Sequence, residues 1–220
     1  MPGGRREGGR AAVTVPRHRV RWREDGPAAT AEALLAAAGR RAILVLEIPG
    51  GASGPAVPLP VLERLRSAVA VTVADASGTV SGGALELAVS ADLLYLREGA
   101  ALDPGDGVPS PAVVAAFAAA GRRAARRLLL EPGPIGAEEA VRLGVASGVL
   151  GPGEPLPLPE TVSFAALAAA RDLVRAAPGL ARPARLALER AAFQLLFAVG
   201  DPQEGARAFL ERREPRFPSE

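Results

Sequence analysis

The stretch VTVADASGTVSGGALELAVSADLLYL, Val71–Leu96, decides how this chain folds. An apolar run from Val69 to Ala74, typical of a β-strand, breaks at Ser77-Gly78 and continues through two further glycines into a helical pattern. Glycines between a strand and a helix let the backbone turn tightly and leave N–H groups free at the positive end of the helix dipole. Glu86 adds a carboxylate one turn into an otherwise apolar helix. The pattern favours either chemistry on a carbonyl group or a plain strand–turn–helix packed through small residues.

Composition narrows the class of protein. The 220 residues are 49% hydrophobic, which predicts one substantial core and a single domain with small additions. Cysteine is absent, so disulfides and thiolate metal sites are excluded. The only histidine, His18, lies among arginines, so we assign it no catalytic role and expect no metal site.

The charge pattern gives little support for nucleic-acid binding. All 26 basic residues are arginine, and the formal net charge is only +2. The exclusive use of arginine as the basic residue, together with many Ala, Gly and Pro residues, is typical of a GC-rich genome. The arginines of 122–127 form a cationic helical face, which is either a solvated surface or a contact for phosphate or an acidic partner.

Residues 1–10 lack the apolar segment of a signal peptide, and no apolar run reaches membrane-spanning length, so we expect a cytoplasmic protein without membrane contact.

Turn and linker residues divide the chain into four parts. We predict a disordered tail at 1–10, an α/β core at 11–150, a Pro/Gly-rich linker at 151–160 and a helical region at 161–220. The predicted strands before the central stretch are Ala11–Val15, Arg19–Arg23 and Arg41–Leu46, with a turn at 16–18. The predicted helices outside it are 31–38 capped by Thr30, 60–67, 110–120 capped by Ser110, and about 162–176, 183–198 and 202–213, the last capped by Asp201. The strand–helix rhythm favours βαβ units with a parallel sheet.

Three segments together resemble the crotonase (enoyl-CoA hydratase/isomerase) superfamily. GTVSGGALELAVSADLLYL (78–96) is similar to the GxxxGGGxEL signature, LLLEPGPIGAEEAVRLGVASGVL (128–150) to an LLLTG-type segment, and EGARAFLERREPRF (204–217) to the C-terminal helix. The resemblance implies an α/β fold, a spiral of ββα repeats, in which residues 161–220 form a helical trimerisation region. It also implies a homotrimer, or a hexamer made of two trimers.

The resemblance implies an acyl thioester as substrate, with coenzyme A or a carrier-protein phosphopantetheine as part of that substrate and no separate cofactor. In the family, two backbone N–H groups hold the thioester oxygen as it becomes an enolate. The match to the glycine motif places one donor at Gly83. The other lies in the loop 49–55, where Ser53 is the best match and Ala52 the alternative. Ala52 and Gly82 are also expected to contact substrate.

The hydratases of the family use two glutamates as acid and base. Glu86 matches the first, and Asp106 falls on the second, with Asp103 as a competing candidate. Phe209 and Arg212 match positions that line the nucleotide end of the coenzyme A site from an adjacent subunit.

The chain also departs from the family pattern. The early P…NA motif is missing, the loop 49–55 lacks an acidic residue after its glycine, the third glycine of the motif is Ala84, and Val108–Pro111 replaces a glycine-rich segment.

The leading hypothesis is an enoyl-thioester hydratase, dehydratase or double-bond isomerase, with a role in secondary metabolism. The alternatives are a decarboxylase or cyclase that uses one acid, and a non-catalytic partner subunit of another enzyme. Glu86 and Asp106 facing one cavity would favour hydration, whereas Asp106 in solvent would favour the alternatives.

Overall fold

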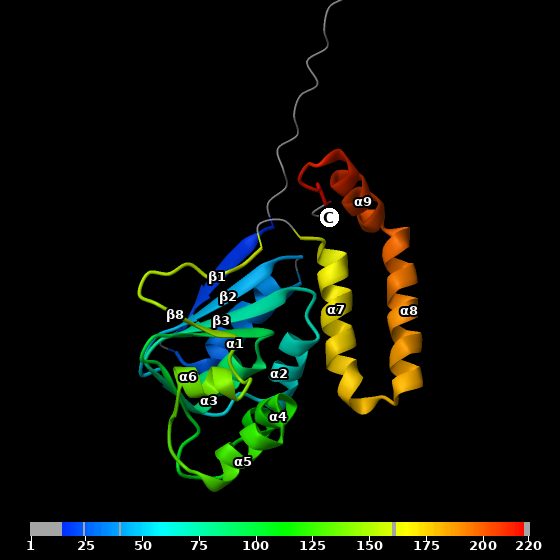
Figure 1. The fold of residues 1–220 in the computed structure, drawn as a ribbon. Coiled ribbons are helices and arrows are strands. Elements are labelled where there is room, and N and C mark those ends of the chain that lie inside the picture. Colours follow the sequence, from blue (N-terminus) through cyan, green and yellow to red (C-terminus); the bar gives the residue numbers. More distant parts are fainter. Residues whose placement is uncertain (1–14, 24, 40, 160–161, 218–220) are drawn as a thin grey trace, which may run out of the picture. The chain divides into compact units, whose positions relative to one another are not determined.

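The computed structural model describes residues 15–23, 25–39, 41–159 and 162–217. It divides into two compact units (Figure 1). The core unit is Pro16–Leu158, and the helical unit has its described residues at Val15, Pro159 and 162–217. The predicted tail and residues 11–14 of the first predicted strand lie outside the described residues.

A five-stranded parallel sheet is the frame of the core unit. Its strand order is β1-β2-β3-β5-β8, and every neighbouring pair is parallel. The strands are β1 (Arg17–Arg21), β2 (Ile43–Ile48), β3 (Val71–Ala76), β5 (Leu93–Arg97) and β8 (Gly148–Leu150). β2 and β3 are almost continuously apolar and buried, as is typical of central parallel strands covered on both faces.

A smaller three-stranded sheet contains β4 (Thr79–Ser81), β6 (Ala101–Asp103) and β7 (Ile135–Gly136). β4 pairs with β6 in parallel, and β6 pairs with β7 antiparallel. The chain therefore passes twice from a strand of the large sheet to a strand of the small sheet and then to a helix. This order places the start of α3 (Gly82–Ser90) directly at the end of β4.

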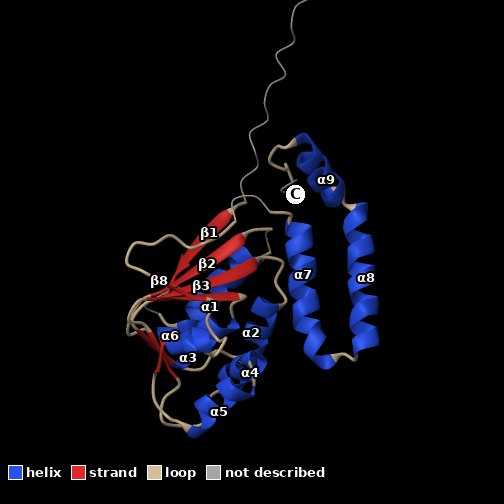
Figure 2. Cartoon of the chain, in the orientation of Figure 1, coloured by secondary structure: helices blue, strands red, loops and turns tan. Residues whose placement is uncertain are grey.

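Helices cover one side of the large sheet (Figure 2). These are α1 (Pro27–Ala38), α2 (Leu59–Arg66) and α3, and they pack on one another and on β1, β2 and β3. Buried side chains such as Leu34, Leu46 and Leu85 fill this layer. Each fully buried leucine contributes about 1.5–3 kcal/mol relative to an exposed one.

The remaining helices of the core unit are α4 (Pro111–Ala120), α5 (Arg122–Leu130) and α6 (Ala137–Arg142). Ser110 caps α4 as predicted, because its Oγ accepts a hydrogen bond from the Val113 N–H at 3.4 Å. On α5, Arg122, Arg123 and Arg126 are exposed.

Two predictions at the start of the chain are wrong. The predicted turn at 16–18 overlaps β1, so His18 is a half-buried strand residue. Thr30 does not cap a helix, because α1 already begins at Pro27. Its buried hydroxyl instead donates to the Gly26 carbonyl and accepts from the Arg23 N–H, both at 3.0 Å. A threonine inside a first turn can thus resemble a cap in the sequence.

The helical unit contains α7 (Phe164–Ala176), a 3₁₀ turn (Ala177–Gly179), α8 (Arg182–Ala198) and α9 (Asp201–Glu211). α7 and α8 lie side by side (Figure 2). The predicted capping role of Asp201 is wrong, because Gly200 occupies that position. The buried Asp201 carboxylate instead accepts a hydrogen bond from the Ser163 hydroxyl at 2.6 Å, which ties the start of α7 to the start of α9.

Candidate functional site

Glu86 is a buried carboxylate in α3. It is 4% exposed and stands between Leu85 and Leu87, which are also buried. Its Oε2 accepts a hydrogen bond from the backbone N–H of Val57 at 2.5 Å. Since a buried charge needs hydrogen-bond partners, this contact from the loop before α2 helps to keep the carboxylate inside the protein.

Gly83 lies one turn before Glu86, in the first turn of α3. Its N–H donates to the carbonyl oxygen of Gly54 at 2.9 Å. A Cβ atom at position 83 would overlap the Pro55 carbonyl oxygen and would lie 2.5 Å from Cγ of Pro27. Only glycine therefore fits here, and the space directly outside its N–H is filled by the chain's own backbone.

The loop that contacts Gly83 also runs beside β4. The Gly51 N–H donates to the Thr79 carbonyl at 2.8 Å, and the Ser81 N–H donates to the Ala52 carbonyl at 3.1 Å. The Ser81 hydroxyl donates to Oγ of Ser53 at 2.8 Å. The loop is thus joined to β4 by two backbone hydrogen bonds.

The structure brings the predicted oxyanion residues together with Glu86. Ser53 is exposed, and its backbone N–H has no hydrogen-bond partner in the part of the chain that the structure describes. Gly82 adopts φ 51°, and a Cβ atom there would lie 3.2 Å from Oγ of Ser53. Ala52 is buried at 6% exposure. One donor is therefore available, whereas the N–H of Gly83 is already in use.

The other acidic candidates lie in the loop between β6 and α4. Asp106 is exposed to solvent. Asp103 is half-buried, and its Oδ1 accepts a hydrogen bond from the Gly105 N–H at 2.9 Å, which closes a local turn. Among the described residues, neither carboxylate forms a hydrogen bond with α3. In the part of the chain that the structure describes, neither Asp103 nor Asp106 is therefore a hydrogen-bond partner of the Glu86 carboxylate.

Phe209 and Arg212, the predicted nucleotide contacts, belong to the helical unit. Phe209 is 82% exposed on α9. Arg212 is exposed and follows the end of α9 with φ 54°, a left-handed conformation. Both side chains are thus accessible at the end of this helix.

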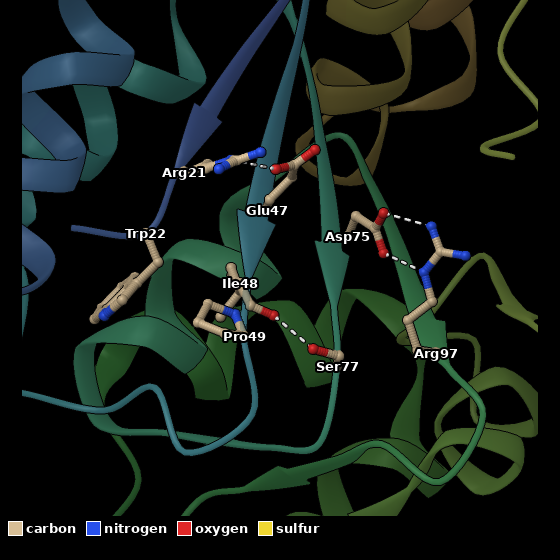
Figure 3. A pocket seen from close by; sticks show the side chains of 8 residues that line it. All are labelled: Arg21, Trp22, Glu47, Ile48, Pro49, Asp75, Ser77 and Arg97. Atoms are coloured by element: carbon tan, nitrogen blue, oxygen red, sulfur yellow. Dashed lines mark hydrogen bonds and ion pairs between the residues drawn. The ribbon is translucent and has the colours of Figure 1, made fainter. Parts of the chain in front are cut away.

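A second feature of the core unit is a pocket of about 350 Å³ near the carboxyl ends of the parallel strands (Figure 3). Its lining residues come from β1, β2, β3 and β5 and the loops that follow them: Arg21, Trp22, Glu47, Ile48, Pro49, Asp75, Ser77 and Arg97. Ligands of open α/β sheets bind near such strand ends. The sequence interpretation missed this pocket.

The charged groups of this pocket are paired (Figure 3). Arg97 binds Asp75 through Nε at 2.8 Å and Nη2 at 2.6 Å, and this contact raises the pKa of Arg97 above its ordinary value. Glu47 accepts from Arg21 at 3.2 Å and from Arg19 at 2.7 Å. A single charged residue at or near the end of each apolar strand is the signal that could have revealed the pocket.

The comparison with known proteins decides the family. The model of the enoyl-CoA hydratase/isomerase family matches residues 58–220, about three quarters of the chain. The chain belongs to the enoyl-CoA hydratase/isomerase family. The resemblance expected from the glycine motif and the two downstream segments is therefore confirmed.

Sequence relatives of this enoyl-CoA hydratase/isomerase family member support the assignment. A protein of Thermus thermophilus, provisionally named an enoyl-CoA hydratase, is 33% identical in an alignment of 157 residues, which covers 66% of this chain and 62% of that protein. A crotonyl-CoA hydratase of Syntrophomonas wolfei is 30% identical in an alignment of 163 residues, which covers 66% of this chain and 60% of that protein. The chain thus spans about three fifths of the length of these curated relatives.

Solved structures confirm the predicted crotonase-like fold. An enoyl-CoA hydratase from Polaromonas sp. JS666 matches with a TM-score of 0.77 at 21% identity, over 94% of this chain and 99% of that one. An enoyl-CoA hydratase from Mycobacterium smegmatis matches with a TM-score of 0.70 at 18% identity, over 94% and 99%. At these identities the likeness establishes the fold.

Two further properties concern membranes and metals. In the described parts of the chain, every helix is too short or too polar to cross a membrane. The same residues contain no cluster of three or more His, Asp or Glu side chains arranged to hold a metal ion.

Proposed function

We propose that this member of the enoyl-CoA hydratase/isomerase family is an enoyl-thioester isomerase that works with a single carboxylate, Glu86. The observation that carries the proposal is the contrast between Glu86, 4% exposed beside Gly83, and Asp106, which is exposed. Addition of water across a double bond needs one group to activate water and one to deliver a proton. A double-bond shift needs only one group that removes a proton and returns it elsewhere.

The proposed reaction moves one proton within the acyl chain. The Glu86 carboxylate takes a proton from C2 of a 3-enoyl thioester, and the electron pair of that C–H bond shifts to the thioester oxygen as an enolate. The N–H groups of Gly83 and Ser53 hold the oxygen, and one such donor typically contributes about 2.7–4 kcal/mol to transition-state stabilisation. The enolate then collapses to the 2-enoyl thioester as C4 takes the proton back, which restores the carboxylate.

The experiment that tests this function is incubation of the full chain with 3-enoyl- and 2-enoyl-CoA, followed by chromatography and mass spectrometry. We expect the two isomers to interconvert without a gain of water, and with incorporation of deuterium when the solvent is D₂O. Accumulation of a 3-hydroxyacyl product would instead show hydration and would require a second acid. The same thioesters on a carrier protein distinguish coenzyme A from phosphopantetheine as the natural carrier.

A second candidate function is a non-catalytic partner subunit of another enzyme. One observation favours it: the Gly83 N–H and the Glu86 carboxylate are both bonded to the loop 54–57. If these two hydrogen bonds were never broken, no thioester could bind at the site. Absence of binding of any acyl-CoA, together with co-purification of an active enzyme subunit, would support this function.

We also propose that the chain forms homotrimers through its helical unit. None of the residues of α8 is buried, and Leu195 is 71% exposed. Phe209 and Leu210 of α9 are 82% and 80% exposed. Exposed apolar surface of this kind marks an interaction site. Sedimentation velocity should give a particle of three or six chains, and replacement of Leu195 by Glu should shift it toward the monomer.

A further inference from the structure

The loop of residues 51–57, here called the latch loop, is bonded to the site that the proposed chemistry uses. Three backbone hydrogen bonds of 2.8–3.1 Å join it to β4 and to the start of α3. The 2.5 Å bond from the Val57 N–H holds its far end to Glu86. One short segment therefore contacts both the expected oxyanion donor and the expected base.

The latch loop takes the place of a substrate at the Gly83 N–H. The Gly54 carbonyl oxygen stands 2.9 Å from the Gly83 nitrogen, which is where a thioester carbonyl oxygen would have to bind. The Val57 N–H binds one oxygen of the Glu86 carboxylate and holds this side chain in place. Since one N–H cannot hold two carbonyl oxygens at full strength, loop and substrate compete.

We propose that the Gly54 carbonyl of the latch loop is an autoinhibitory contact at Gly83, which an acyl thioester displaces when it binds while Ser53 and Val57 stay in place; this inference rests on the proposed thioester chemistry. Displacement exchanges one carbonyl for another at Gly83, so the number of hydrogen bonds at that donor is conserved. The loop returns when the product leaves.

The construction of the latch loop suits such a movement. Residues 54–56, which would move, are exposed, and Ala52 and Val57 on either side of them are buried, at 6% and 5% exposure. Gly51 and Gly54 adopt φ values of 81° and 120°, so the backbone can turn here at little cost. Opening of the middle part therefore exposes little apolar surface.

A disulfide can lock the loop, because the Oγ atoms of Ser53 and Ser81 are only 2.8 Å apart and the chain has no native cysteine. In the S53C/S81C double variant of the full chain, we expect the oxidised form to bind butyryl-CoA at least tenfold more weakly than the reduced form. Reductant should restore the affinity. The wild-type chain, treated with the same oxidant and reductant, is the control. Equal affinity of the oxidised and reduced forms would overturn the proposal.

Amide hydrogen exchange at Gly83 tests the latch without a substrate. A loop that opens gives a Gly83 amide that exchanges at least tenfold faster than that of Leu87 in the same helix, and the disulfide slows it. If neither wild type nor the reduced variant binds butyryl-CoA, this pattern still supports the latch while the thioester function fails. A Gly83 amide as slow as Leu87 in the reduced protein would overturn the latch.

A glycine variant provides the opposite perturbation. A Cβ atom at position 54 would lie 2.7 Å from Cδ of Pro27, so Gly54→Ala should weaken the latch and speed exchange of the Gly83 amide at least fivefold. Gly133→Ala is the matched control, because Gly133 has a similar φ of 113° and no atom within 4 Å of the added Cβ. Equal exchange at Gly83 in both variants would contradict the proposal.

Discussion

Glu86 and Asp106 differ in almost every physical property that matters for a catalytic acid or base. Glu86 is held in a helix, 4% exposed, with a backbone N–H on its carboxylate. Asp106 lies in a loop of glycines and prolines and is exposed. A helix restricts the direction of a side chain to a few rotamers, whereas a solvated loop residue is surrounded by water that competes for every contact. The comparison teaches that the fold holds one of the two predicted acids, Glu86, in a fixed place and leaves the other, Asp106, in solvent.

The largest expected effect is on turnover in Glu86→Gln. The amide keeps the shape of the side chain and can still accept the Val57 hydrogen bond, but it cannot take a proton. General acid–base catalysis contributes about 10²- to 10⁴-fold, so we expect a loss of that size in the isomerisation of 3-enoyl-CoA. Steady-state kinetics measure the loss, and circular dichroism checks that the fold is retained. Full activity of this variant would remove Glu86 from the mechanism.

Glu86→Leu should lower the free energy of unfolding. Leucine fills the space, but it leaves the N–H of Val57, a residue 5% exposed, without its acceptor. A buried donor without a partner costs about 1–3 kcal/mol. Urea denaturation measures the difference from wild type.

The matched control for this stability prediction is Glu63→Leu on the exposed face of α2. There we expect a change within about 0.5 kcal/mol, as for ordinary surface substitutions. Equal losses in both variants would mean that the Val57 contact does not stabilise the fold.

The sequence predicts the position of Glu86 well because the information is local. The run Gly82–Ser90 has the glycines of a tight helix entry followed by small and apolar residues, and the helix forms over that range. The fold follows from the same stretch together with the two downstream segments. The cap of α4 by Ser110 could be predicted for the same reason, because it depends only on residues that are close in the sequence.

The sequence could not predict the hydrogen bond that the Gly83 N–H donates to Gly54. The bond between Gly83 and Gly54 depends on how a loop from one repeat packs beside the next, with Pro27 from a third segment behind it. The pocket near the strand ends also depends on how segments that are distant in the sequence lie beside one another. Glu47 and Asp75 become neighbours only through the register of β2 and β3, which the sequence alone does not give.

A carboxylate outside the site gives a measure of how much an ion pair at the surface contributes. Arg213 binds both oxygens of Glu204 at 2.7 and 3.1 Å, and with the Arg216 N–H it lowers the pKa of Glu204 to about 2. The folded pKa is below the unfolded one, so this stabilisation is present above about pH 4.5 and is lost as the pH falls toward 2. The melting temperature of Glu204→Gln should therefore fall less steeply over that range than that of wild type. The exposed Glu189→Gln should follow wild type.

The smallest expected effect is that of Asp106→Asn. Because the Asp106 side chain is exposed and forms no hydrogen bond with α3 among the described residues, removal of its charge should change kcat/KM for 3-enoyl-CoA by less than about twofold. Asp103→Asn should behave similarly, since asparagine can still accept the Gly105 N–H. A loss of tenfold or more in Asp106→Asn alone, with unchanged melting temperature, would mean that the loop brings this carboxylate to the substrate. The protein would then have the two acids of a hydratase, and the contrast with Glu86 would hold only for the unliganded chain.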